Sequence, residues 1–184
     1  MIIKNTKIII YLIIFHLLVT TISNALVVFP VTFLGYKLTW AAFVFPLVVV
    51  ATDLTVRLLG KKIAQKTITY TYPLAIIFSI LAVFIEKDSL NIAFRVGFAS
   101  ATSYALGIII DIFAFQQIRN NYKAWWIAPS LSTVISNFID TYTFFFTAFY
   151  NSKDKFMSEN WTEIAFNQTI IKIFIGILFF LPVY

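Results

Sequence analysis

Five ionisable side chains lie inside long apolar stretches of the sequence, where a charge is costly. They are Asp53, Arg95, Asp111, Asp140 and Lys172. In the hydrocarbon of a membrane such a side chain costs about 2.5–3.5 kcal/mol even on the most lenient scale, so it typically pairs with another charge or faces a substrate or ion pathway. We therefore treat these positions as candidates for binding and ion pairing rather than for covalent chemistry.

The sequence gives little support for a catalytic site or a metal site. The chain has no cysteine and one histidine, His16, which argues against a thiolate nucleophile, a metal centre and a catalytic triad. It also has no Gly-rich phosphate-binding loop, so we do not expect it to hydrolyse ATP. We expect no enzyme activity, no cofactor and no metal site.

Asp140 and Lys172 fall at similar depths in two different apolar runs. At about 1.5 Å per helical residue, Asp140 lies roughly 21 Å from the cytoplasmic end of its run, and Lys172 roughly 12 Å from the opposite side of a core about 30 Å thick. We predict either an ion pair between them or a cavity that both face. Asp140 also has polar neighbours at Ser136, Asn137 and Thr141, which makes it the strongest candidate for contact with a substrate or ion.

A second charged group is predicted near the cytoplasmic boundary. Asp53 and Arg57 are four residues apart and share a helix face, and Asp111 falls within about 10 Å of the same boundary. Arg57 could pair with either acid, and the two acids could belong to one ionic latch between helices. Arg57 and Arg95 have a second interpretation, because an arginine near a helix end often extends to the lipid headgroups.

The elements that must position these residues follow from composition. Of 184 residues, 60% are hydrophobic and 12% are charged, against about 45–50% and 25% in ordinary soluble domains. Six apolar runs of roughly spanning length lie near residues 8–28, 40–59, 69–85, 92–115, 126–150 and 164–183. None alternates as a barrel strand would. We predict an all-α fold, with one domain over residues 1–184 that forms an integral membrane bundle of six transmembrane helices.

The basic residues predict the orientation of this bundle. Most of them fall in connections on the side of the N-terminus: Lys4, Lys7, Arg57, Lys61, Lys62, Lys66, Arg119 and Lys123. The other side has Lys37, Lys87, Lys153 and Lys155. Cytoplasmic loops carry the excess of Lys and Arg, so both termini are expected in the cytoplasm. Because the net charge of +6 is spread over connections rather than gathered on one face, we do not expect binding to nucleic acid.

The first run also has features of a secretory signal peptide. Lys4 and Lys7 precede it, and small residues occur at Ser23 and Ala25. However, the apolar stretch resumes at residues 26–29, and cleavage would leave an odd number of helices. We expect the segment to be retained as the first membrane helix.

The order of polar and apolar residues resembles one known family. The stretch Thr39-Trp40-Ala41-Ala42-Phe43-Val44-Phe45-Pro46, followed by Ala51-Thr52-Asp53-Leu54-Thr55-Val56-Arg57-Leu58-Leu59-Gly60, resembles the queuosine precursor transporter family, also known as the vitamin uptake transporter family. Segments 15–24, 95–115, 125–141 and 156–184 are similar to the same family in the same order. The resemblance implies a multi-pass protein of the bacterial inner membrane that imports 7-cyano-7-deazaguanine and 7-aminomethyl-7-deazaguanine.

The resemblance also suggests roles for the polar residues within the runs. A guanine-like base presents adjacent N–H groups that a carboxylate can accept, a carbonyl that needs a donor, and a flat ring that stacks on aromatic side chains. The candidates are Asp140 or Asp53 for the carboxylate, Asn24, Asn137 or Lys172 for the carbonyl and ring acceptors, and Tyr104 or Phe43 for stacking. Arg57, Arg95 and Asp111 would then serve in gating or as ion pairs.

Three questions stay open at this point. The chain could instead be the substrate-binding subunit of an energy-coupling-factor-type vitamin importer driven by a partner ATPase, since such subunits are also small six-helix proteins. The sequence leaves open whether uptake is facilitated or coupled to protons. A bundle this small often pairs, so a homodimer in the lipid bilayer is an alternative to a monomer.

Overall fold

The computed structural model describes residues 2–45, 47, 60–124 and 126–180. These residues are mostly helical. The long helices are α1 (Ile2–Leu26), α3 (Lys61–Lys87), α4 (Leu90–Asn121), α5 (Ile127–Phe149) and α6 (Lys155–Phe180). A short hairpin of β1 (Pro30–Phe33) and β2 (Tyr36–Thr39) follows α1, and residues 41–45 continue as a helical segment.

Each of the five long helices coincides with one of the predicted apolar runs. Several of these helices continue past the ends of their runs. α4 continues through residues 116–121, and α6 begins at Lys155 rather than near residue 164. Both extensions are polar, so hydropathy alone ends the runs early although the backbone stays helical. Of the run predicted at 40–59, residues 41–45 and 47 are helical, and residues 48–59 lie outside the described part.

The hairpin is an element that the sequence analysis does not predict. Its strands pair antiparallel in the register Pro30 with Thr39 and Phe33 with Tyr36. The two residues between them, Leu34 and Gly35, have φ angles of 51° and 84°, as a two-residue turn that follows the twist of the strands requires. The connection between the first two predicted runs therefore contains regular structure.

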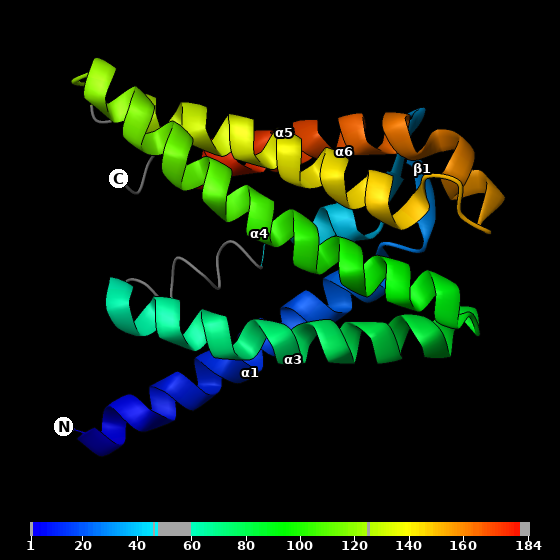
Figure 1. Cartoon of the computed structure of the whole chain (residues 1–184), viewed down its shortest axis with the longest axis horizontal. Coiled ribbons are helices and arrows are strands. Elements are labelled where there is room, and N and C mark those ends of the chain that lie inside the picture. The colour runs from blue at the N-terminus through cyan, green and yellow to red at the C-terminus, as the bar shows by residue number, and fades with distance from the viewer. Residues whose placement is uncertain (1, 46, 48–59, 125, 181–184) are drawn as a thin grey trace.

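The helices form two pairs joined by α4 (Figure 1). α1 packs on α3, α5 packs on α6, and α4 runs obliquely between the pairs, in contact with both α3 and α5. The start of α1 and the end of α6 lie at one end of the bundle, and the hairpin, the α3–α4 turn and the α5–α6 connection lie at the other. We call the latter the hairpin end.

Close helix contact depends on small side chains in α4. A Cβ added at Gly97 would overlap the Ile80 side chain of α3, and one at Gly107 would lie 3.4 Å from the Asp140 Cβ of α5. Small residues allow such approaches between membrane helices. The buried apolar core, which includes Val28, Val96 and Phe149, joins these helices to the segment that follows the hairpin.

The outer faces of the helices expose many large apolar side chains, and the interior contains several polar ones. Rows of exposed apolar side chains four residues apart cover the outer helix faces: Ile10, Ile14, Leu18 and Ile22 on α1, Phe94 and Phe98 on α4, and Phe166, Ile170 and Phe174 on α6. Polar side chains are buried instead, among them Asn24, Ser100, Gln168 and Lys172. Lys7–Leu26 and Thr69–Lys87 are long and apolar enough to cross a membrane by length and composition. This reversed distribution fits a protein with lipid on the outside.

Candidate substrate cavity

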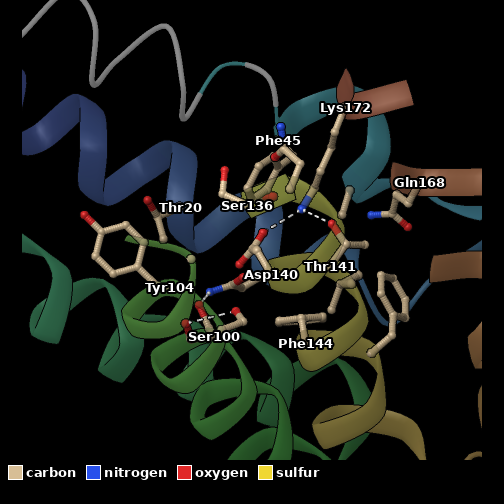
Figure 2. A pocket seen from close by; sticks show the side chains of 18 of the residues that line it. Thr20, Phe45, Ser100, Tyr104, Ser136, Asp140, Thr141, Phe144, Gln168 and Lys172 are labelled. Atoms are coloured by element: carbon tan, nitrogen blue, oxygen red, sulfur yellow. Dashed lines mark hydrogen bonds and ion pairs between the residues drawn. The ribbon is translucent and has the colours of Figure 1, made fainter. Parts of the chain in front are cut away.

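A cavity of about 300 Å³ lies between the helices (Figure 2). Side chains from α1, α3, α4, α5, α6 and the 41–45 segment surround it: Thr20, Ser23, Asn24, Val27, Ala41, Phe45, Tyr72, Ser100, Ser103, Tyr104, Gly107, Ser136, Asn137, Asp140, Thr141, Phe144, Phe145, Gln168 and Lys172. Cavities that hold small molecules begin at about this volume. Most of the lining surface is apolar, but many of the lining residues place a polar group in it, which suits a flat ligand with polar edges.

Asp140 and Lys172 form an ion pair inside the cavity. Nζ of Lys172 lies 3.1 Å from Oδ2 of Asp140 and donates to the Thr141 hydroxyl at 3.0 Å. It also lies 3.6 Å from the centre of the Phe45 ring. The side chains are 7% and 20% exposed, for Lys172 and Asp140 respectively. The comparison of depths in the sequence therefore predicts a contact that the structure contains.

Gln168 completes this part of the cavity. It lies four residues before Lys172 on the same face of α6, and its Oε1 accepts a hydrogen bond of 3.0 Å from the buried hydroxyl of Thr39. We call Asp140, Thr141, Gln168 and Lys172 the charged half of the cavity. The sequence analysis does not single out Gln168, because burial of a neutral amide costs less free energy than burial of a charge. Its spacing of four residues from Lys172 could have indicated it.

The opposite part of the cavity contains hydroxyl, amide and aromatic groups. Nδ2 of Asn24 donates to the hydroxyl oxygens of Ser79 and Ser100 at 3.1 and 3.0 Å. The Tyr72 hydroxyl donates to the carbonyl oxygen of Ser100 at 2.8 Å. The rings of Tyr72 and Tyr104 stack with centroids 3.8 Å apart. We call Asn24, Tyr72, Ser100 and Tyr104 the hydroxyl half; its bonds join α1, α3 and α4.

The structure brings five of the predicted binding residues to one cavity. Asn24, Tyr104, Asn137, Asp140 and Lys172 all line it.

Phe43, also predicted to stack on the ligand, lies elsewhere. It is 45% exposed and packs against Phe33 and Trp40. Phe45 contributes the ring in the cavity instead. Two residues along a helix turn the side chain by about 200°, so positions 43 and 45 point to different sides.

Of the residues predicted to form a gate or latch, Arg95 is the one whose side chain lies in the described part of the chain. Asp53 and Arg57 lie outside the described residues, and Asp111 is in α4 with its side chain outside the description. Arg95 lies at the hairpin end, where Nε donates to the Ala148 carbonyl oxygen at 2.8 Å and Nη2 donates to that of Tyr150. It thus satisfies the last carbonyls of α5, about 24 Å along α4 from Asp111.

Comparisons with known proteins agree with these observations. Residues 39–184 match the family described as "Putative vitamin uptake transporter". The chain belongs to this family. It is 42% identical over 193 aligned residues to the "Queuosine precursor transporter" of Escherichia coli K12, and 33% identical over 204 aligned residues to the "Probable queuosine precursor transporter" of Haemophilus influenzae. Each alignment covers 98% of this chain and 86% of the relative. No solved structure matches the chain.

Membership in the vitamin uptake transporter family confirms the resemblance seen in the sequence. The family consists of transporters rather than enzymes, so this is a membrane protein of a transporter family. The matched region contains α3 to α6 and therefore both members of the Asp140–Lys172 pair. Of the cavity lining, Thr20, Ser23 and Asn24 of α1 and Val27, directly after α1, precede it.

Proposed function

We propose that this protein imports queuosine precursors, 7-cyano-7-deazaguanine and 7-aminomethyl-7-deazaguanine, across the inner membrane of a bacterium. The proposal combines the names of the two relatives with one observation on this chain, the Asp140–Lys172 pair in the wall of the cavity. A carboxylate and an ammonium 3.1 Å apart offer an acceptor and a donor side by side. That is the complement of an –NH–C(=O)– edge, which these bases have.

The pair can bind this edge without being broken. Oδ2 of Asp140 contacts Lys172, which leaves Oδ1 to accept the ring N–H and the exocyclic amino group of the base. Of the three ammonium hydrogens of Lys172, Asp140 and Thr141 take two, and the third is available for the carbonyl oxygen. Such charge-assisted bonds are about twice as strong as neutral ones, so this edge would supply most of the specificity.

The flat ring of the base would lie against aromatic side chains. Phe45 and Tyr104 line opposite parts of the cavity, and Tyr104 is already stacked on Tyr72. Asn137 lines the same space and would donate to the remaining ring acceptors, whereas both amide hydrogens of Asn24 are already donated to Ser79 and Ser100. The described cavity thus offers each kind of group that a deazaguanine requires.

The arrangement of helices supports a six-span topology with both termini in the cytoplasm. The start of α1 and the end of α6 lie at the same end of the bundle (Figure 1), where the excess of Lys and Arg also lies in the sequence. The 41–45 segment leaves the hairpin end, and α3 begins at the other end, so residues 40–59 would form the remaining span. The cavity would then be reached from the two sides in turn.

The proposal is tested in a bacterium that can neither synthesise nor import queuosine precursors. Expression of this chain, with precursor in the medium, should restore queuosine in tRNA, measured by mass spectrometry of tRNA digests. Asp140→Asn should lower uptake at least about 100-fold, because two bonds to a charged group are worth about 3 kcal/mol together. Asp154→Asn is the matched control, since it makes the same chemical change at a carboxylate that pairs with Lys87 outside the cavity. If the wild-type chain restores no modification at normal membrane levels, the proposed substrate is wrong.

Purified protein in liposomes addresses the alternative of a subunit that needs a partner ATPase. Uptake of labelled precursor by the chain alone would exclude that alternative. Binding without uptake would instead support it, and the precursor would then remain the ligand.

A further inference from the structure

The amide of Gln168 is held in one orientation inside the cavity. The side chain is 3% exposed, and its Oε1 accepts the hydrogen bond from Thr39, which is fully buried. An amide that accepts through its oxygen leaves its nitrogen with two hydrogens to donate. In Figure 2 this nitrogen is on the side of the amide that faces Thr141. Among the described residues no acceptor is bonded to it.

Thr39 is itself held in place, because β2 is attached to one face of α6. Lys37 Nζ contacts Asn160 Oδ1 and Glu163 Oε2, each at 2.8 Å, and Asn167 Nδ2 donates to the Lys37 carbonyl oxygen at 2.9 Å. These α6 residues and Gln168 recur at helical spacing on the side that meets the hairpin. The hairpin therefore fixes the amide of Gln168 as a donor towards the cavity.

Three groups then stand in a definite order across the charged half. Asp140 is an acceptor, Lys172 is a donor 3.1 Å away, and Gln168 is a second donor one helical turn from Lys172, or about 6 Å along α6. In Figure 2 they appear in this order. Along one edge of a 7-substituted deazaguanine the order is the ring N–H, the carbonyl oxygen and then the substituent at C7. The order of groups in the cavity matches the order of groups on the base if Gln168 faces the C7 substituent.

We propose that Gln168 is a specificity residue that contacts the C7 substituent and favours the cyano over the aminomethyl precursor. The inference rests on the proposed function. A nitrile nitrogen accepts the hydrogen bond that the Gln168 amide donates. An aminomethyl group is protonated at neutral pH, has only hydrogens to donate, and would lie beside the Lys172 ammonium. The charges of the described cavity lining, Asp140 and Lys172, already balance each other, so a further positive charge finds no partner there.

Gln168→Glu is the decisive variant because it keeps the shape of the side chain and replaces the donating amide nitrogen with an accepting carboxylate oxygen. One carboxylate oxygen can still accept from Thr39, while the other faces the cavity as a charged acceptor. Initial rates of uptake of labelled cyano and aminomethyl precursors are measured in cells without their own transporter, at equal membrane levels. We expect the ratio of cyano to aminomethyl uptake to fall at least about tenfold, since a bond to a charged group is worth about 1.5–3 kcal/mol.

Two further variants protect the test against a simple folding defect. Gln168→Met, which cannot donate, should lower cyano uptake and leave aminomethyl uptake unchanged. Thr39→Val, which frees the amide to rotate, should weaken the cyano preference by about threefold, as expected for one neutral hydrogen bond. Gln116→Glu is the matched control: it makes the same chemical change on an exposed position of α4 and should not alter the ratio.

The outcomes separate the inference from the proposed function. If the wild-type chain takes up both precursors and all Gln168 variants keep the wild-type ratio, the role of Gln168 is wrong and the proposed function stands. If the wild-type chain takes up neither precursor, both are wrong. A fall in the ratio for Gln168→Glu, with none for Gln116→Glu, supports the inference.

Discussion

The two halves of the cavity use their polar groups differently. In the hydroxyl half, Asn24 donates both of its amide hydrogens to Ser79 and Ser100, and the Tyr72 hydroxyl bonds to Ser100 as well, so these groups mostly satisfy one another. In the charged half, Lys172 keeps a hydrogen, and Asp140 keeps an oxygen, beyond their mutual contact. The hydroxyl half therefore joins α1, α3 and α4, while the charged half is available to a ligand. Stability should depend more on the first and transport more on the second.

The largest expected effect comes from removing one member of the ion pair. Lys172→Met leaves the partly buried Asp140 without its partner, a change that costs up to about 3–5 kcal/mol when the charge is fully buried, and it removes the donor for the substrate carbonyl. We expect a large fall in melting temperature in detergent and loss of uptake. The double variant Asp140→Asn with Lys172→Met should recover most of the stability, because no unpaired charge remains, but no uptake.

The double variant is what makes this comparison informative. Recovery of stability without uptake would separate the cost of a buried charge from its function. Uptake by the double variant would contradict a role for the pair in binding, and the charged half would then be purely structural.

The sequence predicts the two charged residues of the cavity better than the neutral residues around them, because burial of a charge costs more free energy. Charged residues are rare in this chain and expensive in lipid, so their depths in the apolar runs carry information, and Asp140 and Lys172 do meet. Neutral groups have no such cost. Only the spacing of Gln168 from Lys172 could have indicated that residue. Tyr72 and Ser100 could be found only once the helix faces were known, and the difference between Phe43 and Phe45 depends on the rotation of one helix.

The fold likewise has elements that hydropathy predicts and an element that it does not predict. Long apolar runs give the helices, with ends that differ where α4 and α6 continue as polar helix. The hairpin depends instead on a local turn at Leu34 and Gly35 and on contacts with α6, such as the bonds of Lys37 to Asn160 and Glu163. Those partners are more than 120 residues apart, and no local pattern relates them.

A smaller effect is expected in the hydroxyl half, and on a different quantity. Asn24→Ala removes hydrogen bonds to Ser79 and Ser100, which should lower the stability by about 1–3 kcal/mol. Uptake per folded molecule should fall less than about tenfold, since the substrate edge is bound elsewhere. Melting in detergent and uptake normalised to folded protein measure the two quantities.

A matched control for this variant lies at the end of α4. Asn121→Ala removes one exposed hydrogen bond, to the Gln117 carbonyl oxygen, and should leave the melting temperature unchanged. If Asn24→Ala melted like the wild type and yet transported nothing, the hydroxyl half would bind the substrate as directly as the charged half does.

The smallest effect should come from Tyr104, where ring and hydroxyl can be tested separately. Its ring stacks on Tyr72 and faces the cavity, and an aromatic contact is worth about 0.5–1.5 kcal/mol beyond the burial of its area. Tyr104→Leu removes the stacking and should lower the apparent affinity for precursor by about two- to tenfold. Tyr104→Phe keeps the ring and should bind within about twofold of the wild type, because the hydrogen bonds described for the hydroxyl half join Tyr72, Ser100 and Asn24 without the Tyr104 hydroxyl. Titration of uptake rate against precursor concentration distinguishes the two. Equal losses in both variants would mean that the hydroxyl, not the ring, contacts the substrate, and the hydroxyl half would then share in reading the polar edge of the base.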